Sequence, residues 1–262
     1  MSESKPRPVF LDGVWGQDAL KQFHDHGRAA QAAFPGPNYL EWLRWLHDRL
    51  RPRWYCEIGV EYGRSFELIR PETQAVGIDP VPRIERPPTS RAKLFPMRSD
   101  DFFLAGSANT VLGDERFDFG FIDGLHVFDQ VVRDFVHLER FSRADAVIAI
   151  HDVLPLCEDV ATPLRRTLFW TGDAFRALLV LAELRPDLRV AAIPCFPSGL
   201  ALITGLNPQN VTDTSAYAAA VAAWDLVAFD VAMAELKRRV AVLPNEFTAV
   251  AHYLALGARE AP

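Results

Sequence analysis

The feature that most constrains the fold is the stretch from Trp54 to Ile69. Trp54–Ile58 is a short, mostly apolar run, typical of a buried strand. Gly59 and Gly63 follow it, and Ser65–Ile69 predicts the start of a helix. A glycine-containing turn between a strand and a helix lets a ligand approach the backbone and directs the positive helix end toward it. This stretch is therefore either a ligand loop or an ordinary strand-to-helix turn.

Further short apolar runs alternate with segments of helical spacing. The predicted strands after the first cover residues 75–80, 93–97, 117–123, 146–150, 188–193 and 199–204. Only Pro194–Ser198 separates the last two, which is too short for a crossover helix and predicts an antiparallel hairpin. The pattern predicts an α/β fold: a Rossmann-like, doubly wound, mostly parallel seven-stranded sheet with an antiparallel last strand.

Helical extensions are predicted on both sides of this sheet domain, which we place at residues 53–205. Residues 1–52 form a predicted N-terminal helical cap, with one helix at 18–33 and another that begins after an Asn38 N-cap and ends at Pro52. Residues 206–262 form a predicted C-terminal helical extension, with helices near 215–240 and 245–256. These helices would cover the outside or contact another subunit, so we expect a homo-oligomer.

Composition excludes several classes of protein. The chain has 262 residues, of which 49% are hydrophobic and 24% charged, as in a globular protein. Its net charge of −6 argues against a nucleic-acid partner, which needs a basic surface. Cys56, Cys157 and Cys195 are odd in number and have no CxxC spacing, which fits a reducing compartment. No apolar run approaches the roughly 20 residues of a membrane span, and Met1–Pro8 lacks a signal-peptide core. We therefore expect a cytoplasmic protein with no membrane partner.

Acidic residues end several predicted strands, and the carboxyl ends of parallel strands meet at one edge of a sheet. Asp79 lies twenty-two residues after Glu57, where an acid binds ribose hydroxyls in nucleotide-binding sheets. The alternative is that Asp79 only caps a helix or orders the turn before Pro80.

The glycine pattern departs from the GxGxxG of dinucleotide-binding loops. Gly59 and Gly63 are separated by three residues, and no third glycine follows at the expected place. Glu57 and Glu61 would repel a pyrophosphate at this turn. Acids suit a ligand with a positive centre and an amino group, and S-adenosylmethionine has both.

Four motifs together resemble those of the class I S-adenosylmethionine-dependent methyltransferases. They are residues 57–65 (EIGVEYGRS), 77–80 (GIDP), 121–126 (FIDGLH) and 150–153 (IHDV). Within this superfamily the chain is most similar to the small-molecule and sugar O-methyltransferases of the macrocin and cephamycin type. The resemblance covers about residues 54–205. It implies methylation of a hydroxyl group on a small-molecule or glycosidic acceptor.

The resemblance also implies a cofactor-binding set along the loop after the first strand and at the ends of the next strands. Its members are Glu57 near the ammonium, Gly59 and Gly63 along the methionine part, Ser65 at the helix start, Asp79 at the ribose hydroxyls, Asp100 or Asp101 near the adenine amino group, and Asp123 beside the reacting methyl.

A divalent metal is a separate hypothesis. Asp123 ends one predicted strand, and His151 and Asp152 end the next, so the three side chains could converge on an ion. Metal-dependent O-methyltransferases resemble this arrangement, in which the ion lowers the pKa of the acceptor hydroxyl. Magnesium prefers oxygen ligands, whereas imidazole suits manganese, iron or zinc better. The sequence leaves both the use of a metal and the choice between Mg²⁺ and Mn²⁺ open.

His126 is the alternative catalytic base, beside Asp123 and His151 as catalytic candidates. It follows Asp123 by three residues, and an ordinary histidine pKa near 6.5 allows it to accept a hydroxyl proton directly. The competing interpretations are that His126 only orders its loop and that His151 is a core histidine. For 170–176, which contains Trp170 and Arg176, we expect an N-cap and core aromatic residues.

Two other functions stay open from the sequence. An NAD-type Rossmann oxidoreductase would need a tighter glycine loop and no antiparallel end. A non-catalytic nucleotide-binding protein would bind the cofactor without turnover.

Overall fold

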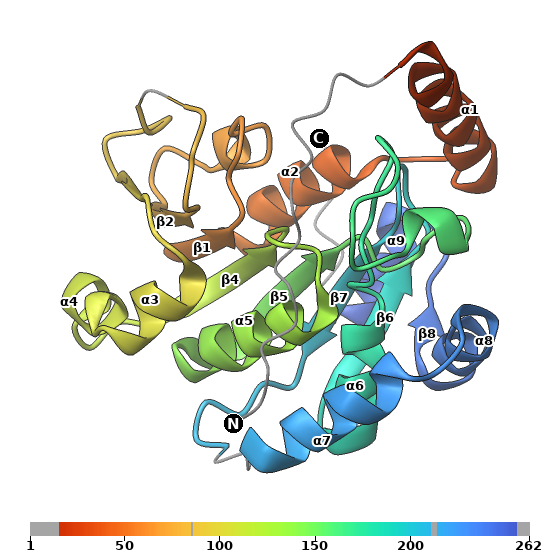
Figure 1. The fold of residues 1–262 in the computed structure, drawn as a ribbon. Helices are drawn as coiled ribbons and strands as arrows, with labels where there is room; N and C mark the ends of the chain where they lie inside the picture. The colour runs from red at the N-terminus through yellow and green to blue at the C-terminus, as the bar shows by residue number, and fades with distance from the viewer. Residues whose placement is uncertain (1–15, 85, 211–213, 256–262) are drawn as a thin grey trace.

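The computed structural model describes residues 16–84, 86–210 and 214–255, which form one sheet with helices on both faces (Figure 1). The order of the strands is β3-β2-β1-β4-β5-β7-β6-β8. They are β1 (Trp54–Ile58), β2 (Gln74–Ile78), β3 (Ala92–Phe95), β4 (Phe117–Ile122), β5 (Ser142–His151), β6 (Arg189–Ile193), β7 (Leu200–Thr204) and β8 (Ala241–Val242). β1 to β5 pair in parallel, and β7 is antiparallel to both of its neighbours. The predicted doubly wound sheet and its antiparallel hairpin are confirmed.

Two hydrophobic cores lie on opposite faces of the sheet, because successive side chains of a strand point to opposite sides. In β1, Cys56 and Ile58 belong to the larger core and Tyr55 to the smaller one. The larger core is covered by α3 (Ser99–Leu104), α4 (Ser107–Leu112), α5 (Phe128–Arg140), α6 (Arg176–Leu184), α7 (Thr214–Asp225) and α8 (Phe229–Arg239). The smaller core is covered by α2 (Tyr39–Leu50), the 3-10 turn η1 (Phe66–Leu68) and α9 (Phe247–Tyr253).

The two extensions fold onto the sheet. Asn38 caps α2 as predicted, since its side chain accepts hydrogen bonds from the backbone N–H groups of Leu40 and Glu41. The indole N–H of Trp42, on α2, donates to Asn245 Oδ1 at 2.6 Å. This hydrogen bond joins the N-terminal extension to the C-terminal extension. Residues 1–15 and 256–262 of the predicted extensions lie outside the described residues. The division into three domains stays a prediction.

The prediction of a helix after β1 is wrong. Where Ser65–Ile69 predicts the start of a helix, the chain makes only η1, and Ile69 is already extended, with φ −61° and ψ 145°. Pro71 explains the difference, because a proline has no N–H for the helix and disfavours helical backbone at the residue before it. Consequently no helix dipole points at the loop after β1.

Three further boundaries differ from the prediction. The single helix expected at 215–240 is divided into α7 and α8 around residues 226–228, and both packed pieces contact α6. The sequence also predicts one helix through residues 172–184 and another from about Phe102. The structure begins the first, α6, at Arg176 and the second, α3, at Ser99, three residues before Phe102. β8 has only two residues and was not predicted, since so short a strand leaves no periodic pattern.

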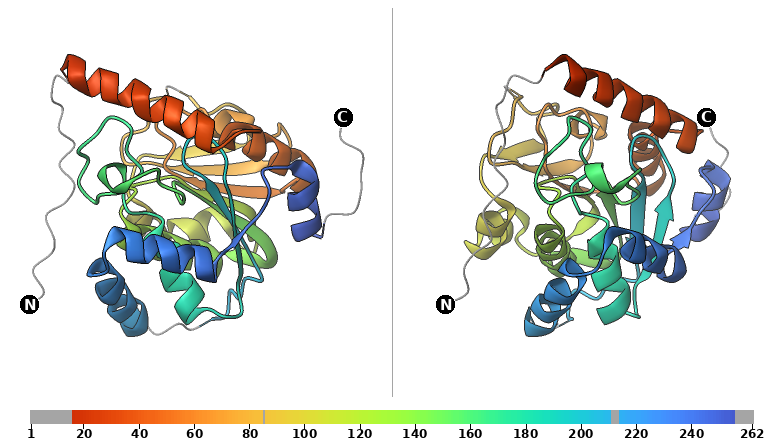
Figure 2. Two further views of the ribbon diagram at one scale, coloured as in Figure 1. Left: turned by 90° about the vertical axis from the view of Figure 1, so that its right-hand side faces the viewer. Right: turned by 45° about the vertical axis from the view of Figure 1, so that its right-hand side comes forward.

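A long connection joins β5 to α6 over residues 152–175 and contains the 3-10 turn η2 (Glu158–Val160). Connections in compact domains usually have about 4–6 residues, and much longer ones are commonly functional. Figure 2 shows α1 (Gln17–Ala33) running beside this connection. Ala30 of α1 packs against Val160 and Phe169 of the connection in a small separate core. The first predicted helix, at 18–33, is confirmed and covers this part of the molecule.

Candidate functional site

The loop after β1 lies against the loop after β4. Gly59 has φ +90°, and a Cβ at this position would come 2.1 Å from the carbonyl oxygen of Asp123. Its N–H donates to Ile78 O, while Asp123 N–H donates to Ile58 O. The structure therefore requires glycine at 59 for backbone packing between the two loops. A role of Gly59 in lining the methionine part of a cofactor stays a prediction, as it does for Gly63, which has φ +75°.

Glu57 is fully buried beneath this loop. Tyr55 Oη donates to Glu57 Oε2 at 2.7 Å, and Ser65 Oγ donates to Glu57 Oε1 at 2.6 Å. Burial raises the pKa of Glu57 to about 8, although the hydrogen bonds from Ser65 and Tyr55 lower it. A nearby ammonium group would lower this pKa again, so Glu57 suits a cationic ligand. Glu57 also fixes Ser65.

Asp79 organises the same loop from the end of β2. Its Oδ2 accepts hydrogen bonds from the N–H groups of Val60 and Glu61, at 3.0 and 2.8 Å, and its Oδ1 accepts one from Val81 at 2.7 Å. Asp79 therefore orders the turn before Pro80, which was the alternative interpretation of this residue. An ionised carboxylate has about four acceptor positions, which leaves room for a ribose hydroxyl.

The two acids proposed for the adenine subsite differ in their surroundings. Asp100 is half-buried, and Gln130 Nε2 and His137 Nε2 lie 3.3 and 3.4 Å from its Oδ1. The hydrogen bond from His137 is the main reason why the pKa of Asp100 is lowered. Asp101 is exposed. Of the two, Asp100 is the carboxylate that tertiary contacts hold in place.

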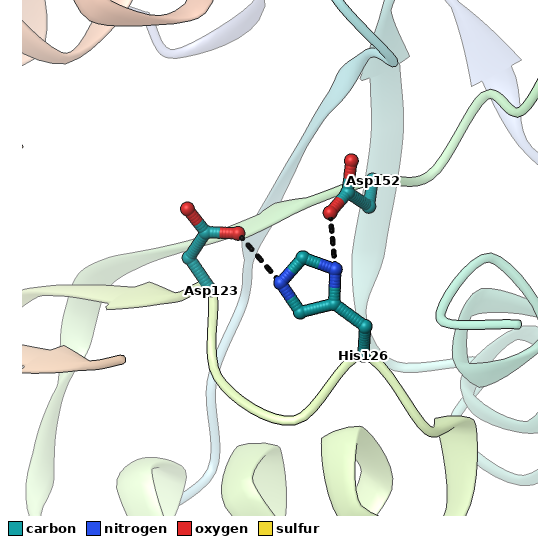
Figure 3. A group of neighbouring side chains, drawn as sticks. All are labelled: Asp123, His126 and Asp152. Atoms are coloured by element: carbon teal, nitrogen blue, oxygen red, sulfur yellow. Dashed lines mark ion pairs between the residues drawn. The ribbon is translucent and has the colours of Figure 1, made fainter. Parts of the chain in front are cut away.

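The centre of the candidate site is His126, which lies between Asp123 and Asp152 (Figure 3). His126 Nδ1 is 2.6 Å from Asp152 Oδ2, and His126 Nε2 is 3.5 Å from Asp123 Oδ1. Burial lowers the pKa of His126, but Asp152 and then Asp123 raise it more, to about 9. Burial raises the pKa of Asp152, but His151 and His126 lower it below its ordinary value. The group is a histidine held by one carboxylate and facing another.

Unusual backbone places these side chains. His126 and Asp152 both have φ of 60°, in the left-handed region that side-chain-bearing residues rarely adopt. A Cβ on Gly172 would come 1.9 Å from His126 O, so only glycine lets the β5–α6 connection approach this closely. Ser198 Oγ donates to Asp152 Oδ1 and fixes the carboxylate from the β6–β7 turn. Three separate loops, after β4, after β5 and between β6 and β7, thus converge on the group of His126 and Asp152.

His151 occupies the neighbouring position at the end of β5. Its Nδ1 is 3.0 Å from Asp123 Oδ1 and 3.7 Å from Asp152 Oδ1. Tyr39 stacks on the ring, with the centroids 4.2 Å apart. Burial lowers the pKa of His151, but Asp152 and Asp123 raise it more, so the net shift is upward. His151 therefore holds Asp123 in place, and Tyr39 covers the ring of His151.

The donor set for a metal differs from the one that the sequence predicted. Among the described residues, Asp123, His126 and Asp152 bring ligand atoms within 4.8 Å of one another, so the histidine of this group is His126 rather than His151. Two carboxylates and an imidazole fit Mn²⁺ better than Mg²⁺. These residues could hold such an ion if His126 turned away from its direct contact with Asp152.

The 170–176 segment contains a core aromatic residue, the buried Phe175, as we expected, but the expected N-cap is wrong, because the N-cap residue of α6 makes no side-chain hydrogen bond. Asp173 Oδ1 accepts a hydrogen bond from Phe128 N–H at 2.9 Å and so supports the start of α5. Arg176 is buried and donates to Trp224 O at 2.6 Å. Trp170, however, stacks on the His126 ring at 5.4 Å with an interplanar angle of 7°. Trp170 therefore belongs to the wall of the site.

Sequence reasoning missed Tyr39 and Ser198, which contact His151 and Asp152. They come from segments far apart in the chain, and neither lies in a recognisable motif. The only signal was that Tyr39 follows the Asn38 cap.

Residues 56–153 match the family model of a methyltransferase domain. No curated protein matches the chain. Among solved structures, the chain is similar to cofactor-bound Rv0187 from MTB, at 20% identity and a TM-score of 0.50, over 77% of this chain and 99% of that one. It is also similar to the O-methyltransferase TomG from Streptomyces achromogenes, at 19% identity and a TM-score of 0.50, over 74% and 92%. At these identities the likeness shows the fold.

A search for membrane-spanning helices among the described residues finds no helix with the length and apolar character that a span requires.

Proposed function

We propose that the chain is an S-adenosylmethionine-dependent methyltransferase that methylates a hydroxyl group of a small-molecule or glycosidic acceptor. The match of residues 56–153 to the family model of a methyltransferase domain and the likeness of the fold to the solved structures support this proposal. The observation that carries this proposal is the His126 imidazole held by Asp152 and directed at Asp123. This group lies at the carboxyl edge of the sheet, beside the loop after β1, where ligands bind in such folds.

S-adenosylmethionine would lie along the loop after β1. Asp79 would accept hydrogen bonds from the ribose hydroxyls, and Asp100 would approach the adenine amino group. Glu57, Gly59, Gly63 and Ser65 would surround the methionine part, with Asp123 near the positive sulfonium. The fit is electrostatic, because three carboxylates at this edge favour a cationic ligand over a pyrophosphate. This difference also disfavours the oxidoreductase alternative.

The chain's own part in the reaction is to position the acceptor and accept its proton. Bound S-adenosylmethionine would supply the methyl group to the acceptor oxygen, and His126 Nε2 would accept the hydroxyl proton. Asp152 holds Nδ1 and stabilises the imidazolium that results, as in other His–carboxylate pairs. His151 is a positioning residue here, because it fixes Asp123.

A metal-assisted route is the second candidate, and the convergence of Asp123, His126 and Asp152 favours it. A bound divalent ion would lower the pKa of the acceptor hydroxyl. We propose the direct route first because both ring nitrogens of His126 already face carboxylates.

Removing metal should therefore leave methyl transfer largely intact. Protein treated exhaustively with a chelator should retain activity in metal-free buffer, because His126 accepts the proton directly. Methyl transfer is measured with radiolabelled S-adenosylmethionine across a panel of hydroxylated acceptors. Activity that disappears on chelation and returns with Mn²⁺ would favour the metal route instead.

Replacing Asp79 should weaken cofactor binding. In Asp79→Ala the dissociation constant for S-adenosylmethionine, measured by calorimetry, should rise about tenfold or more, because hydrogen bonds to charged groups contribute about 1.5–3 kcal/mol. Asp79→Asn keeps one oxygen acceptor for the loop and separates ligand contact from loop order. Asp114→Ala removes an exposed acid elsewhere and serves as the control. Unchanged affinity in folded Asp79→Ala contradicts the ribose assignment, and binding of NAD without S-adenosylmethionine contradicts the proposed function.

The cytoplasmic location, the homo-oligomeric state and the macrocin and cephamycin type of acceptor are further parts of this proposal. A non-catalytic binding protein would bind the cofactor but transfer no methyl group to any acceptor.

A further inference from the structure

The β5–α6 connection brings one arginine to the candidate site. Arg165 Cζ lies 5.8 Å from the ring centroid of Trp170, and Trp170 stacks on His126. Trp170 is itself fixed, since its indole N–H donates to Thr162 O at 2.7 Å. Arg165 is also close enough to His126 to lower its pKa. Arg165 therefore belongs to the same site as the proposed base.

The hydrogen-bonding capacity of Arg165 is mostly unused. A guanidinium group has five N–H donors. One of its terminal nitrogens, Nη2, donates to Leu168 O at 3.1 Å, which holds the side chain against its own loop. The Nε atom is buried and has no hydrogen-bond partner among the described residues. A buried donor without a partner is destabilising, so such groups usually mark the place of a ligand or a water.

The nearby acids do not neutralise Arg165. Asp152 and Asp123 face His126, and Asp152 also accepts the hydrogen bond from Ser198. In the part of the chain that the structure describes, Arg165 forms no ion pair with either acid. Its positive charge is thus held in a partly buried place, against an aromatic ring, without an anion of the protein.

The exposed neighbour, Arg166, shows the contrast. Arg166 is exposed to solvent, whereas Arg165 is half-buried and lies against Trp170. Two adjacent arginines with the same charge therefore differ in whether they face the site.

We propose that Arg165 binds an anionic oxygen group of the acceptor, so that the substrate carries a carboxylate or phosphate ester as well as the hydroxyl that is methylated. This inference rests on the proposed function. A guanidinium fork matches the paired oxygens of both groups. The stacking distances of 5.4 and 5.8 Å along His126, Trp170 and Arg165 limit the separation of hydroxyl and anion to the length of a small metabolite.

The test uses protein loaded with S-adenosylhomocysteine and pairs of probes that differ in charge. Hydroxybenzoates are compared with the matching hydroxybenzamides, and sugar phosphates with the free sugars. In the wild-type protein the anionic member of at least one pair should bind about tenfold or more tightly than its neutral partner, since charged hydrogen bonds are strong. The two sets distinguish a carboxylate from a phosphate.

Arg165→Met should remove this preference, and Arg166→Met should retain it, because both variants lose one positive charge but only Arg165 faces the site. Arg165→Lys keeps the charge and should retain part of the preference, which guards against a misfolded methionine variant. The proposal is overturned if no anion binds better than its neutral partner, or if Arg165→Met keeps the preference. It is also overturned if Arg165→Met weakens binding of S-adenosylhomocysteine instead, because the guanidinium would then bind the carboxylate of the cofactor.

The failure of this inference differs from the failure of the proposed function. Protein that binds S-adenosylhomocysteine without preferring anions refutes this inference alone, whereas protein that binds neither cofactor form refutes the proposed function.

Discussion

Replacing His126 by glutamine should lower the rate of methyl transfer by about 10²- to 10⁴-fold, the usual contribution of a positioned general base. Glutamine can still occupy the space between the two carboxylates but cannot accept the acceptor proton at neutral pH. Affinity for S-adenosylmethionine should stay close to that of the wild-type protein, because His126 contacts Asp152 and Trp170 rather than the loop after β1. Single-turnover rates and calorimetry measure the two quantities separately.

The pH profile gives an independent check on His126. The carboxylates of Asp152 and Asp123 raise its pKa to about 9, so the imidazole is mostly protonated at neutral pH in the free protein. A base must be neutral to accept a proton, so kcat/KM should increase as the pH rises toward 9 and level off above it. His126→Gln should lose this rise.

His24→Gln, on the exposed face of α1, is the matched control and should keep both the rate and the profile. A His126→Gln protein that retains the wild-type rate and pH profile would refute the assignment of the base.

Replacing Glu139 by glutamine should destabilise the fold by about 3 kcal/mol, the lower end of the range for breaking a buried ion pair. Glu139 and Arg185 are 5% and 3% exposed and form a two-pronged pair with N–O distances of 2.6 and 2.8 Å. Glu139 also accepts a hydrogen bond from Asn207 N–H at 2.9 Å. The variant replaces the carboxylate that faces the buried Arg185 by a neutral amide, while the contact with Asp187 remains, so part of the charge of Arg185 is no longer compensated.

Urea denaturation measures the free energy of unfolding of this variant. Glu115→Gln is the control, because the Glu115–Arg53 pair is exposed and such pairs contribute about 0–1 kcal/mol. The double variant Glu139→Leu/Arg185→Leu should recover much of the loss, because it buries no unpaired charge. Equal stability of Glu139→Gln and Glu115→Gln would show that the buried pair contributes little.

The sequence predicts which acids lie at the edge of the sheet, but not which side chains contact one another there. The strand-end positions of Asp79, Asp123 and Asp152 follow from the strands themselves, since a strand that ends at a loop leaves the next residue at the sheet edge. Which histidine faces both acids does not follow. His126 was expected as the alternative to a metal and His151 as a ligand, and the structure instead groups Asp123 and Asp152 most closely with His126.

Features that depend on neighbours along the chain could be predicted from the amino-acid sequence. The alternation of strands and helices, the hairpin across Pro194–Ser198 and the Asn38 cap arise from local periodicity, loop length and side-chain chemistry. The sequence also contains the residue that prevents a helix after β1, because Pro71 lies where that helix would have continued.

The assembly of the site depends on tertiary contacts, because the contacts between its residues join distant segments of the chain. Tyr39 reaches His151 from α2, and Ser198 reaches Asp152 from the β6–β7 turn. The left-handed backbone of His126 and Asp152 and the close approach at Gly172 depend on packing between loops, which no local pattern encodes. The position of Arg165 likewise depends on its folded loop, which holds it against Trp170 without an ion pair to any acid among the described residues.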